Sequence, residues 1–247
     1  MNQRAKLRLY SVIKMVFLTL VISSAVHGQT ENLDQPYPDY PSIKESKKAF
    51  NRYFGNDYDS ALLLAKEKYL FAYERNWSGG IASFGLMLSK AYGNIDQLDS
   101  SLYYLNISQE AAKDISVDKP DQIKWVKTIQ ANQNVSLAHI LIRKGNYDSA
   151  IFQGKRALGY YSEIEDSVGI SSAKNLLGAV SYYSGDVNEA AKYFSEGYQL
   201  QLLLGDTNNA VMTLGNLGSI YKAQGDLPKA MDAFMEQLQL GKEVKMK

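Results

Sequence analysis

The feature that most constrains this chain is a ten-residue motif that returns at a fixed interval. GDVNEAAKYF is followed forty residues later by GDLPKAMDAF and preceded forty residues earlier by GNYDSAIFQG. The sixth position of the motif holds Ala150, Ala190 and Ala230, and farther upstream the aligned position holds Ala61 and then Ser101, at the same interval from each other. Five copies at one period predict an array of repeated units.

Each copy contains two segments whose apolar residues follow helical spacing. In SSAKNLLGAVSYYSG, for example, Ala173, Leu176, Leu177 and Val180 stand at i, i+3, i+4 and i+7, which places them on one face of a helix. The fold class is therefore predicted to be all-α, with no strands. The interval between the second and third copies is longer by nine, and we expect the nine extra residues around KDISVDKPDQ, a polar stretch that contains Pro120.

The turns between the predicted helices have a recurring chemistry. The glycine that opens each motif stands where the first helix must end, because glycine readily adopts a positive φ. An Asn or Asp follows it, and such side chains accept hydrogen bonds from the free N–H groups of the next helix. The predicted N-caps are Asn146, Asp166, Asp186, Asp206 and Asp226.

Small residues recur where the two helices of a copy must approach each other. Ala138, Gly178 and Gly218 occupy one position of the first helix, opposite the alanines of the motif. Helices approach closely only where the side chains at the contact are small. Phe194 and Phe234 are expected to fill the space between neighbouring pairs. Because a single hairpin cannot bury its own apolar face, the copies must stack.

The N-terminal part of the sequence differs from the rest. Residues 1–28 begin with four basic side chains, continue with a short apolar run at Met15–Ile22 and end in small residues, which is typical of a secretory signal peptide. Residues 29–41, rich in proline, are predicted to form an extended linker. The chain has no cysteine. We therefore expect an exported protein, soluble in the periplasm or outside the cell after signal cleavage.

The residues that catalysis and metal binding require are scarce in this sequence. There are only two histidines, of which His27 is expected to leave with the signal peptide, and no cysteine, so no plausible zinc or copper ligand set exists. No phosphate-binding glycine motif is present. The net charge is +1, whereas nucleic-acid binders are normally strongly basic. We expect no enzymatic activity, no cofactor, no metal and no nucleic-acid partner.

The last copy carries a recognisable pattern, L-G-x2-Y followed by A-x3-F, formed by Leu217, Gly218, Tyr221, Ala230 and Phe234. This pattern resembles the tetratricopeptide repeat, in a variant whose helices are longer than those of the usual repeat of ~34 residues. The resemblance extends over all five copies and weakens toward the N-terminus.

In the fourth copy Ser181 replaces the tyrosine, in the third Gly154 replaces the phenylalanine, and the first copy is degenerate. The resemblance implies a right-handed superhelical solenoid of about five helical hairpins over residues 42–247. The expected repeats are approximately 42–81, 82–130, 131–170, 171–210 and 211–247.

In the family that this chain resembles, the first helix of each pair lines a concave groove that binds peptides or proteins. Transferring the inward-facing positions of the family onto this sequence gives a mixed polar, aromatic and weakly basic lining. The implied binding residues are Lys90, Asn94, Asn132, His139, Arg143, Asn175, Tyr182, Tyr183, Ser219 and Lys222. For His139 a partly exposed helix residue is the plainer interpretation, and any one of these residues could equally serve only to keep the groove hydrated.

Two functional hypotheses follow. The first is an exported scaffold that binds a peptide or protein partner in the concave groove. The second is the sensory N-terminal part of a bacterial histidine kinase or transcriptional regulator whose membrane span and output domain lie outside this sequence. Solenoids usually need a polar capping helix, and none follows the last copy. Self-association through the C-terminal helix, a partner or a longer parent chain would each cover that end.

Overall fold

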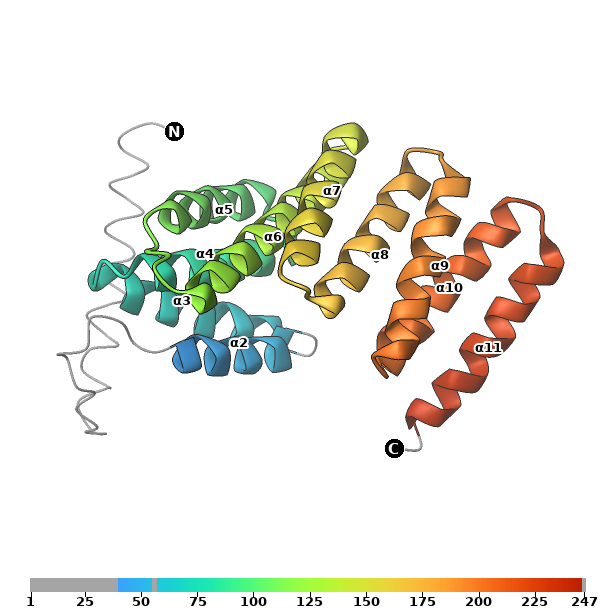
Figure 1. The fold of residues 1–247 in the computed structure, drawn as a ribbon, viewed down its shortest axis with the longest axis horizontal. Coiled ribbons are helices and arrows are strands. Elements are labelled where there is room, and N and C mark those ends of the chain that lie inside the picture. Colours follow the sequence, from blue (N-terminus) through green and yellow to red (C-terminus); the bar gives the residue numbers. More distant parts are fainter. Residues whose placement is uncertain (1–39, 55–56, 246–247) are drawn as a thin grey trace. The chain divides into compact units, whose positions relative to one another are not determined.

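The computed structural model describes residues 40–54 and 57–245 (Figure 1). Within these ranges the chain forms ten helices and no strand, as predicted for an all-α protein. The helices are α2 (Tyr40–Phe54), α3 (Tyr58–Glu74), α4 (Ser78–Asn94), α5 (Leu98–Lys113), α6 (Pro120–Arg143), α7 (Tyr147–Glu163), α8 (Ser167–Tyr183), α9 (Val187–Leu203), α10 (Thr207–Ala223) and α11 (Leu227–Lys245).

The predicted signal peptide, residues 1–28, lies outside the described residues, as does most of the predicted linker. Helix α2 begins at Tyr40, so the last two residues of the 29–41 segment are helical. None of the described helices combines the length and the apolar character that a membrane span would need.

The helices pair in chain order into five hairpins, α2–α3, α4–α5, α6–α7, α8–α9 and α10–α11. Each second helix also contacts the first helix of the next hairpin, so the hairpins stack in sequence. The first hairpin begins two residues before the start expected from the sequence, and the other four begin between four and eleven residues before it. The expected boundaries at 81/82, 130/131, 170/171 and 210/211 therefore fall inside α4, α6, α8 and α10.

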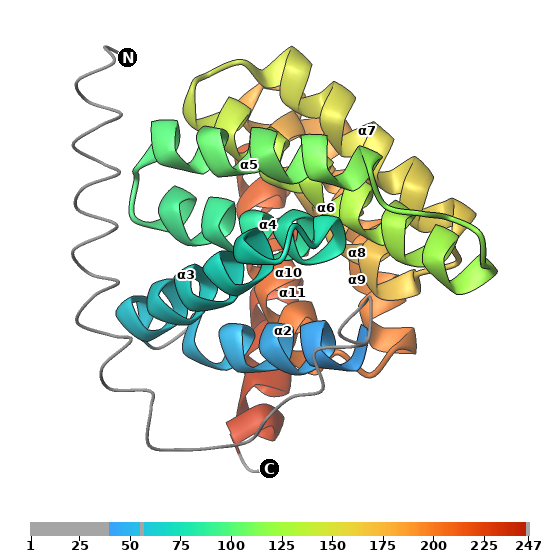
Figure 2. The same cartoon turned by 90° about the vertical axis from the view of Figure 1, so that its left-hand side faces the viewer.

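The stack is asymmetric. The first helices of successive pairs contact one another, α2 with α4, α4 with α6 and α6 with α8, whereas no two successive second helices of the described chain are in comparable contact. Because the first helices lie close together and the second helices lie farther apart, the first helices are on the inner side of the stack. Figure 2 shows the α2 end of the stack, with α3 and α4 between α2 and α5. We call the surface formed by α4, α6, α8 and α10 the first-helix face.

The period of forty has a direct structural basis. Helices α3, α4, α7, α8, α9 and α10 each have 17 residues, and turns of three residues separate most of them. The middle residue of each such turn has a positive φ; it is glycine at four turns, including Gly185 at 91°, and Asn76, Asp96 or Glu165 at the others. All five predicted N-caps are confirmed, for example by the Glu189 N–H, which donates to Asp186 Oδ1 at 3.0 Å.

The break in the period lies in α6. This helix is seven residues longer than α4, α8 and α10, and the loop before it, residues 114–119, has six residues instead of three. Because α5 is one residue short, these changes account for the nine extra residues. The extra residues were expected in a polar loop around Pro120; most of them are helical, and Pro120 is the first residue of α6, where its missing N–H costs no helical bond.

The small residues act as predicted. A Cβ added to Gly178 would lie 2.7 Å from the ring of Phe194, and one added to Gly218 would lie 2.6 Å from Phe234. In the third pair, where Gly154 replaces the phenylalanine, Leu177 of the next pair occupies the space instead, 2.8 Å from where a Cβ would stand. At each contact, a large side chain on one helix leaves room only for a glycine on the facing helix.

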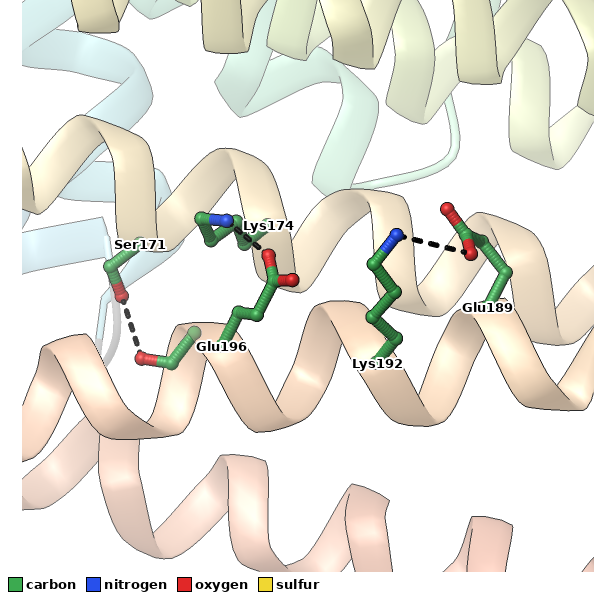
Figure 3. A network of polar contacts seen from close by, with 6 residues as sticks. Ser171, Lys174, Glu189, Lys192 and Glu196 are labelled. Atoms are coloured by element: carbon green, nitrogen blue, oxygen red, sulfur yellow. Dashed lines mark hydrogen bonds and ion pairs between the residues drawn. The ribbon is translucent and has the colours of Figure 1, made fainter.

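Polar contacts supplement this packing between α8 and α9 (Figure 3). Lys174 of α8 points toward Glu196 of α9 and forms an ion pair with it. Ser171 Oγ donates a hydrogen bond to the carbonyl oxygen of Gly197 at 3.5 Å. Partly exposed ion pairs contribute at most about 1 kcal/mol, so apolar packing remains the main source of stability.

Replacing Gly178 with alanine should lower the free energy of unfolding by about 1–3 kcal/mol, because the added methyl group overpacks against Phe194. Gly159 is the matched control, since it lies within α7 and nothing stands within 4 Å of an added Cβ. Gly159→Ala should raise stability by up to about 1 kcal/mol through helix propensity. Urea unfolding of both variants provides the measurement; equal effects of the same sign would contradict the close-contact interpretation.

Candidate functional site

The first-helix face carries nine of the ten residues expected to line a groove. Lys90, His139 and Ser219 share one repeat position, together with Ala179, because the intervals between them are those of the motif. His139 and Ser219 are exposed and Lys90 is partly buried. The helical repeat therefore places a row of side chains across successive first helices.

Lys90 is the most constrained residue of this row. Its ammonium group donates a hydrogen bond to Asn132 Oδ1 at 3.2 Å, and the Asn132 amide in turn donates to the carbonyl oxygen of Thr128 at 2.8 Å. Burial lowers the pKa of Lys90 to about 8, and the positive charge of Lys47 on α2 contributes to the same shift. No carboxylate among the described residues pairs with it.

His139 is next to Lys90 across the contact between α4 and α6. It is open to solvent, yet protein surrounds it on several sides, and this desolvation lowers the pKa of its imidazole. The charges of Lys90 and Arg143 lower the pKa of His139 further. The imidazole is therefore neutral near pH 7 and offers both a donor and an acceptor to a ligand.

Arg143 and Asn94 are held at the edge of this region. The Arg143 guanidinium donates to the carbonyl oxygen of Gly93 and forms an ion pair with Asp96 at 3.2 Å. The side-chain amide of Asn94 donates to Tyr58 Oη at 3.5 Å. Both residues are exposed, so their interactions position them without removing them from solvent.

The C-terminal half of the face is aromatic and neutral apart from one cation. Tyr182 and Tyr183 are exposed, with their rings 6.0 Å apart, and Tyr183 stacks on Tyr147 at 6.2 Å. Ser219 Oγ donates back to the carbonyl oxygen of Gly215 at 2.9 Å. Lys222 is exposed.

Asn175 differs from its expected role. Its side-chain amide donates to Thr213 Oγ1 on α10 at 2.9 Å, and its Oδ1 is buried and lies 2.4 Å from where a Cβ of Gly197 would stand. Asn175 thus belongs to the packing layer between α8, α9 and α10. In the family, the corresponding position faces the groove. Here the side chain of Asn175 turns inward, because Gly197 on α9 leaves space for its amide.

A pocket of about 260 Å³ lies between α2, α4 and α6, and the sequence analysis missed most of its residues. Lys90 and Asn132 were expected to face a ligand, but no residue of α2 was, because the first copy retains too little of the family pattern for its inward positions to be assigned. The repeat period could have found Phe50, which stands exactly one period before Lys90. The lining consists of Ile43, Lys44, Lys47, Phe50, Asn51, Ser83, Leu86, Met87, Lys90, Trp125, Thr128, Ile129 and Asn132.

Two further surfaces bear on the functional predictions. No cluster of three or more His, Cys, Asp or Glu side chains suited to a metal ion occurs in the described part of the chain. Helix α11 exposes an apolar face in which Leu227, Met231, Met235 and Leu238 are 61–65% exposed. Self-association through this helix stays a prediction.

The sequence of the two C-terminal hairpins matches a known family model. Residues 169–243 match the family model of the tetratricopeptide repeat. The match covers nearly all of the two hairpins α8–α9 and α10–α11. A search of curated protein sequences finds no match.

Solved structures extend the tetratricopeptide-like architecture over most of the chain. The apo form of RapI is similar with a TM-score of 0.65 and 14% identity, over 83% of this chain and 72% of that one. A Rap protein complexed with competence and sporulation factor has a TM-score of 0.65 and 18% identity, over 84% of this chain and 55% of that one. A putative kinesin light chain from Podosopora anserina, with nearly identical TPR-like repeats, has a TM-score of 0.57 and 13% identity, over 87% of this chain and 100% of that one. The fold is a tetratricopeptide-like helical solenoid.

Because the pKa of Lys90 is lowered in the folded protein, the site can be tested through the pH dependence of the free energy of unfolding. Between about pH 8 and the ordinary lysine pKa of 10.5, the unfolded chain binds the proton that the folded chain has lost, so Lys90 makes stability rise with pH in this window. Lys90→Met should raise the free energy of unfolding at pH 7 by roughly 1–2 kcal/mol and flatten that rise.

Urea unfolding between pH 7 and pH 10 measures both effects. Lys155→Met is the control, because Lys155 is exposed on α7. A variant at position 90 with the pH profile of the wild type would show that Lys90 is not desolvated.

Proposed function

We propose that this protein is a binding module without catalytic activity, which holds a peptide or protein partner on its first-helix face. The observation that carries the proposal is the row of solvent-accessible polar and aromatic side chains on successive helices at the inner side of the stack. Tetratricopeptide-like folds are scaffolds for protein interactions, and one structural neighbour is a Rap protein complexed with competence and sporulation factor. That likeness supports the proposal at the level of the fold.

The chemistry of the face suits an extended segment of a partner. Its N-terminal half offers cations and amides, from Lys90, Asn132 and Arg143, and its C-terminal half offers the rings of Tyr182 and Tyr183. Side chains on a rigid helical surface can hydrogen-bond to a peptide backbone and stack on its side chains at fixed spacing. A partner with acidic residues toward one end and apolar residues toward the other fits this arrangement.

A double variant tests the face directly. His139→Ala combined with Tyr182→Ala removes two exposed side chains from α6 and α8, and recovery of the partner in a pull-down should fall roughly tenfold or more. The matched control is Phe152→Ala with Lys155→Ala on α7, a second helix, where both residues are exposed. Equal recovery of every partner by the two double variants would refute the assignment.

We also propose that the chain is exported and that residues 1–28 are removed. The support is the sequence order of a basic start, a short apolar run and small residues. Without these residues the chain has 23 basic and 26 acidic side chains, which is a net charge of −3. Mass spectrometry of the protein from fractionated cells should find the mature N-terminus near Gln29 in the envelope or medium. An intact N-terminus in the cytosol would overturn this prediction.

A further inference from the structure

The pocket between α2, α4 and α6 lies where the repeat departs from its period. Position 127 of α6 corresponds to the first residue of α8, so residues 120–126 extend α6 beyond the regular repeat. Trp125 lies in this extension and packs over the start of α4, where a Cβ on Gly79 would come within 2.2 Å of the indole. The same tryptophan lines the pocket. The extension of α6 therefore supplies a wall that the regular pairs lack.

The lining divides into an apolar body and a cationic edge. Six apolar side chains from the three helices form most of the wall, and Phe50, Met87 and Ile129 among them are buried. The basic residues of the lining are Lys44 and Lys47, exposed on α2, and the partly buried Lys90. The lining contains no carboxylate. Three ammonium groups without a counter-charge beside an apolar wall attract an anion that carries an apolar group.

Neutral polar groups complete the site. Asn51 and Asn132 contribute amides, and Asn132 already bonds to Lys90 at 3.2 Å. Ser83 Oγ is buried and has no hydrogen-bond partner among the described residues. Buried polar atoms are normally satisfied, so this hydroxyl is available to a ligand atom in the pocket. Lys90 and Ser83 lie on the same helix, seven residues and about two turns apart, on one face.

We propose that this pocket binds a small monocarboxylic acid with one aromatic or branched aliphatic group, with the carboxylate at Lys90 and the apolar group against Trp125. A volume of about 260 Å³ accommodates a molecule of this size. One carboxylate suffices, because only Lys90 is inside the pocket, while Lys44 and Lys47 stand at its edge. The pocket shares Lys90 and Asn132 with the first-helix face, whereas its apolar wall and the residues from α2 belong to the pocket alone.

The charges around Lys90 set the pH dependence of binding. Lys44 and Lys47 on α2 and His139 on α6 lie around Lys90, and none of these side chains supplies a negative charge to balance its ammonium group. The pKa of Lys90 is lowered to about 8 in the free protein, and a bound carboxylate would raise it by favouring the charged form. Affinity should therefore be greatest below pH 8 and decline above it as Lys90 loses its proton.

Calorimetric titration of the full chain tests the site with three probes: 3-phenylpropanoate, its uncharged amide and acetate. We expect 3-phenylpropanoate to bind, the amide to bind roughly tenfold more weakly because it lacks the charge, and acetate to bind roughly tenfold more weakly because it lacks the ring. Lys90→Met should lose roughly tenfold in affinity for the acid, while Lys155→Met should match the wild type.

A second variant shows whether a loss of binding comes from the pocket itself and not from a change in folding. Thr128→Trp places a ring in the pocket from the partly exposed side of α6 and should abolish binding while circular dichroism shows the same helix content. The proposal is overturned by the absence of heat and of NMR shift changes with 3-phenylpropanoate at millimolar concentration. Equal affinity for the acid and its amide, or wild-type affinity in Lys90→Met, would overturn it as well.

Discussion

The structure depends on one constraint: no hairpin of this chain can bury its own apolar face. Ala190, Phe194 and Tyr198 of α9 are buried in one cluster with Leu214 and Leu217 of α10, the first helix of the next hairpin. Within the hairpin, α8 and α9 approach closely because Gly178 leaves room for the ring of Phe194. Repetition of this contact fixes the spacing of the helices, and the spacing in turn decides which residues reach the first-helix face.

Much of the fold could be predicted from the sequence because its determinants are local and periodic. The N-caps at Asn146 and Asp186 and the small residues at the helix contacts depend on residue type and spacing alone. The phenylalanines were expected between neighbouring pairs, and Phe194 packs against Gly178 within its own pair. Three turns use a non-glycine residue at positive φ, among them Glu165, and sequence alone does not single out such a residue. The stack tolerates this because the turn geometry is imposed by the helices on both sides.

The candidate site was predicted less completely, for a physical reason. A repeat position fixes the direction of a side chain from its helix, so Lys90, His139 and Ser219 share one position on successive pairs. It does not fix what the neighbouring helix offers. Gly197 leaves space into which Asn175 turns, and the extension of α6 brings Trp125 over Gly79. The first outcome depends on the partner helix of the same pair, and the second depends on another copy. The first copy departs so far from the family pattern that no residue of α2 was assigned to the groove.

The nearest-neighbour character of the stack has a consequence for how its two ends can change. Helices contact only those one or two places away in the chain, so a substitution around α2 and α4 has no direct route to α10. In linear arrays of this kind, free energies are close to sums of unit and neighbour contributions. The pocket end and the C-terminal end of the stack can therefore diversify separately, each acquiring new specificity without readjustment of the other.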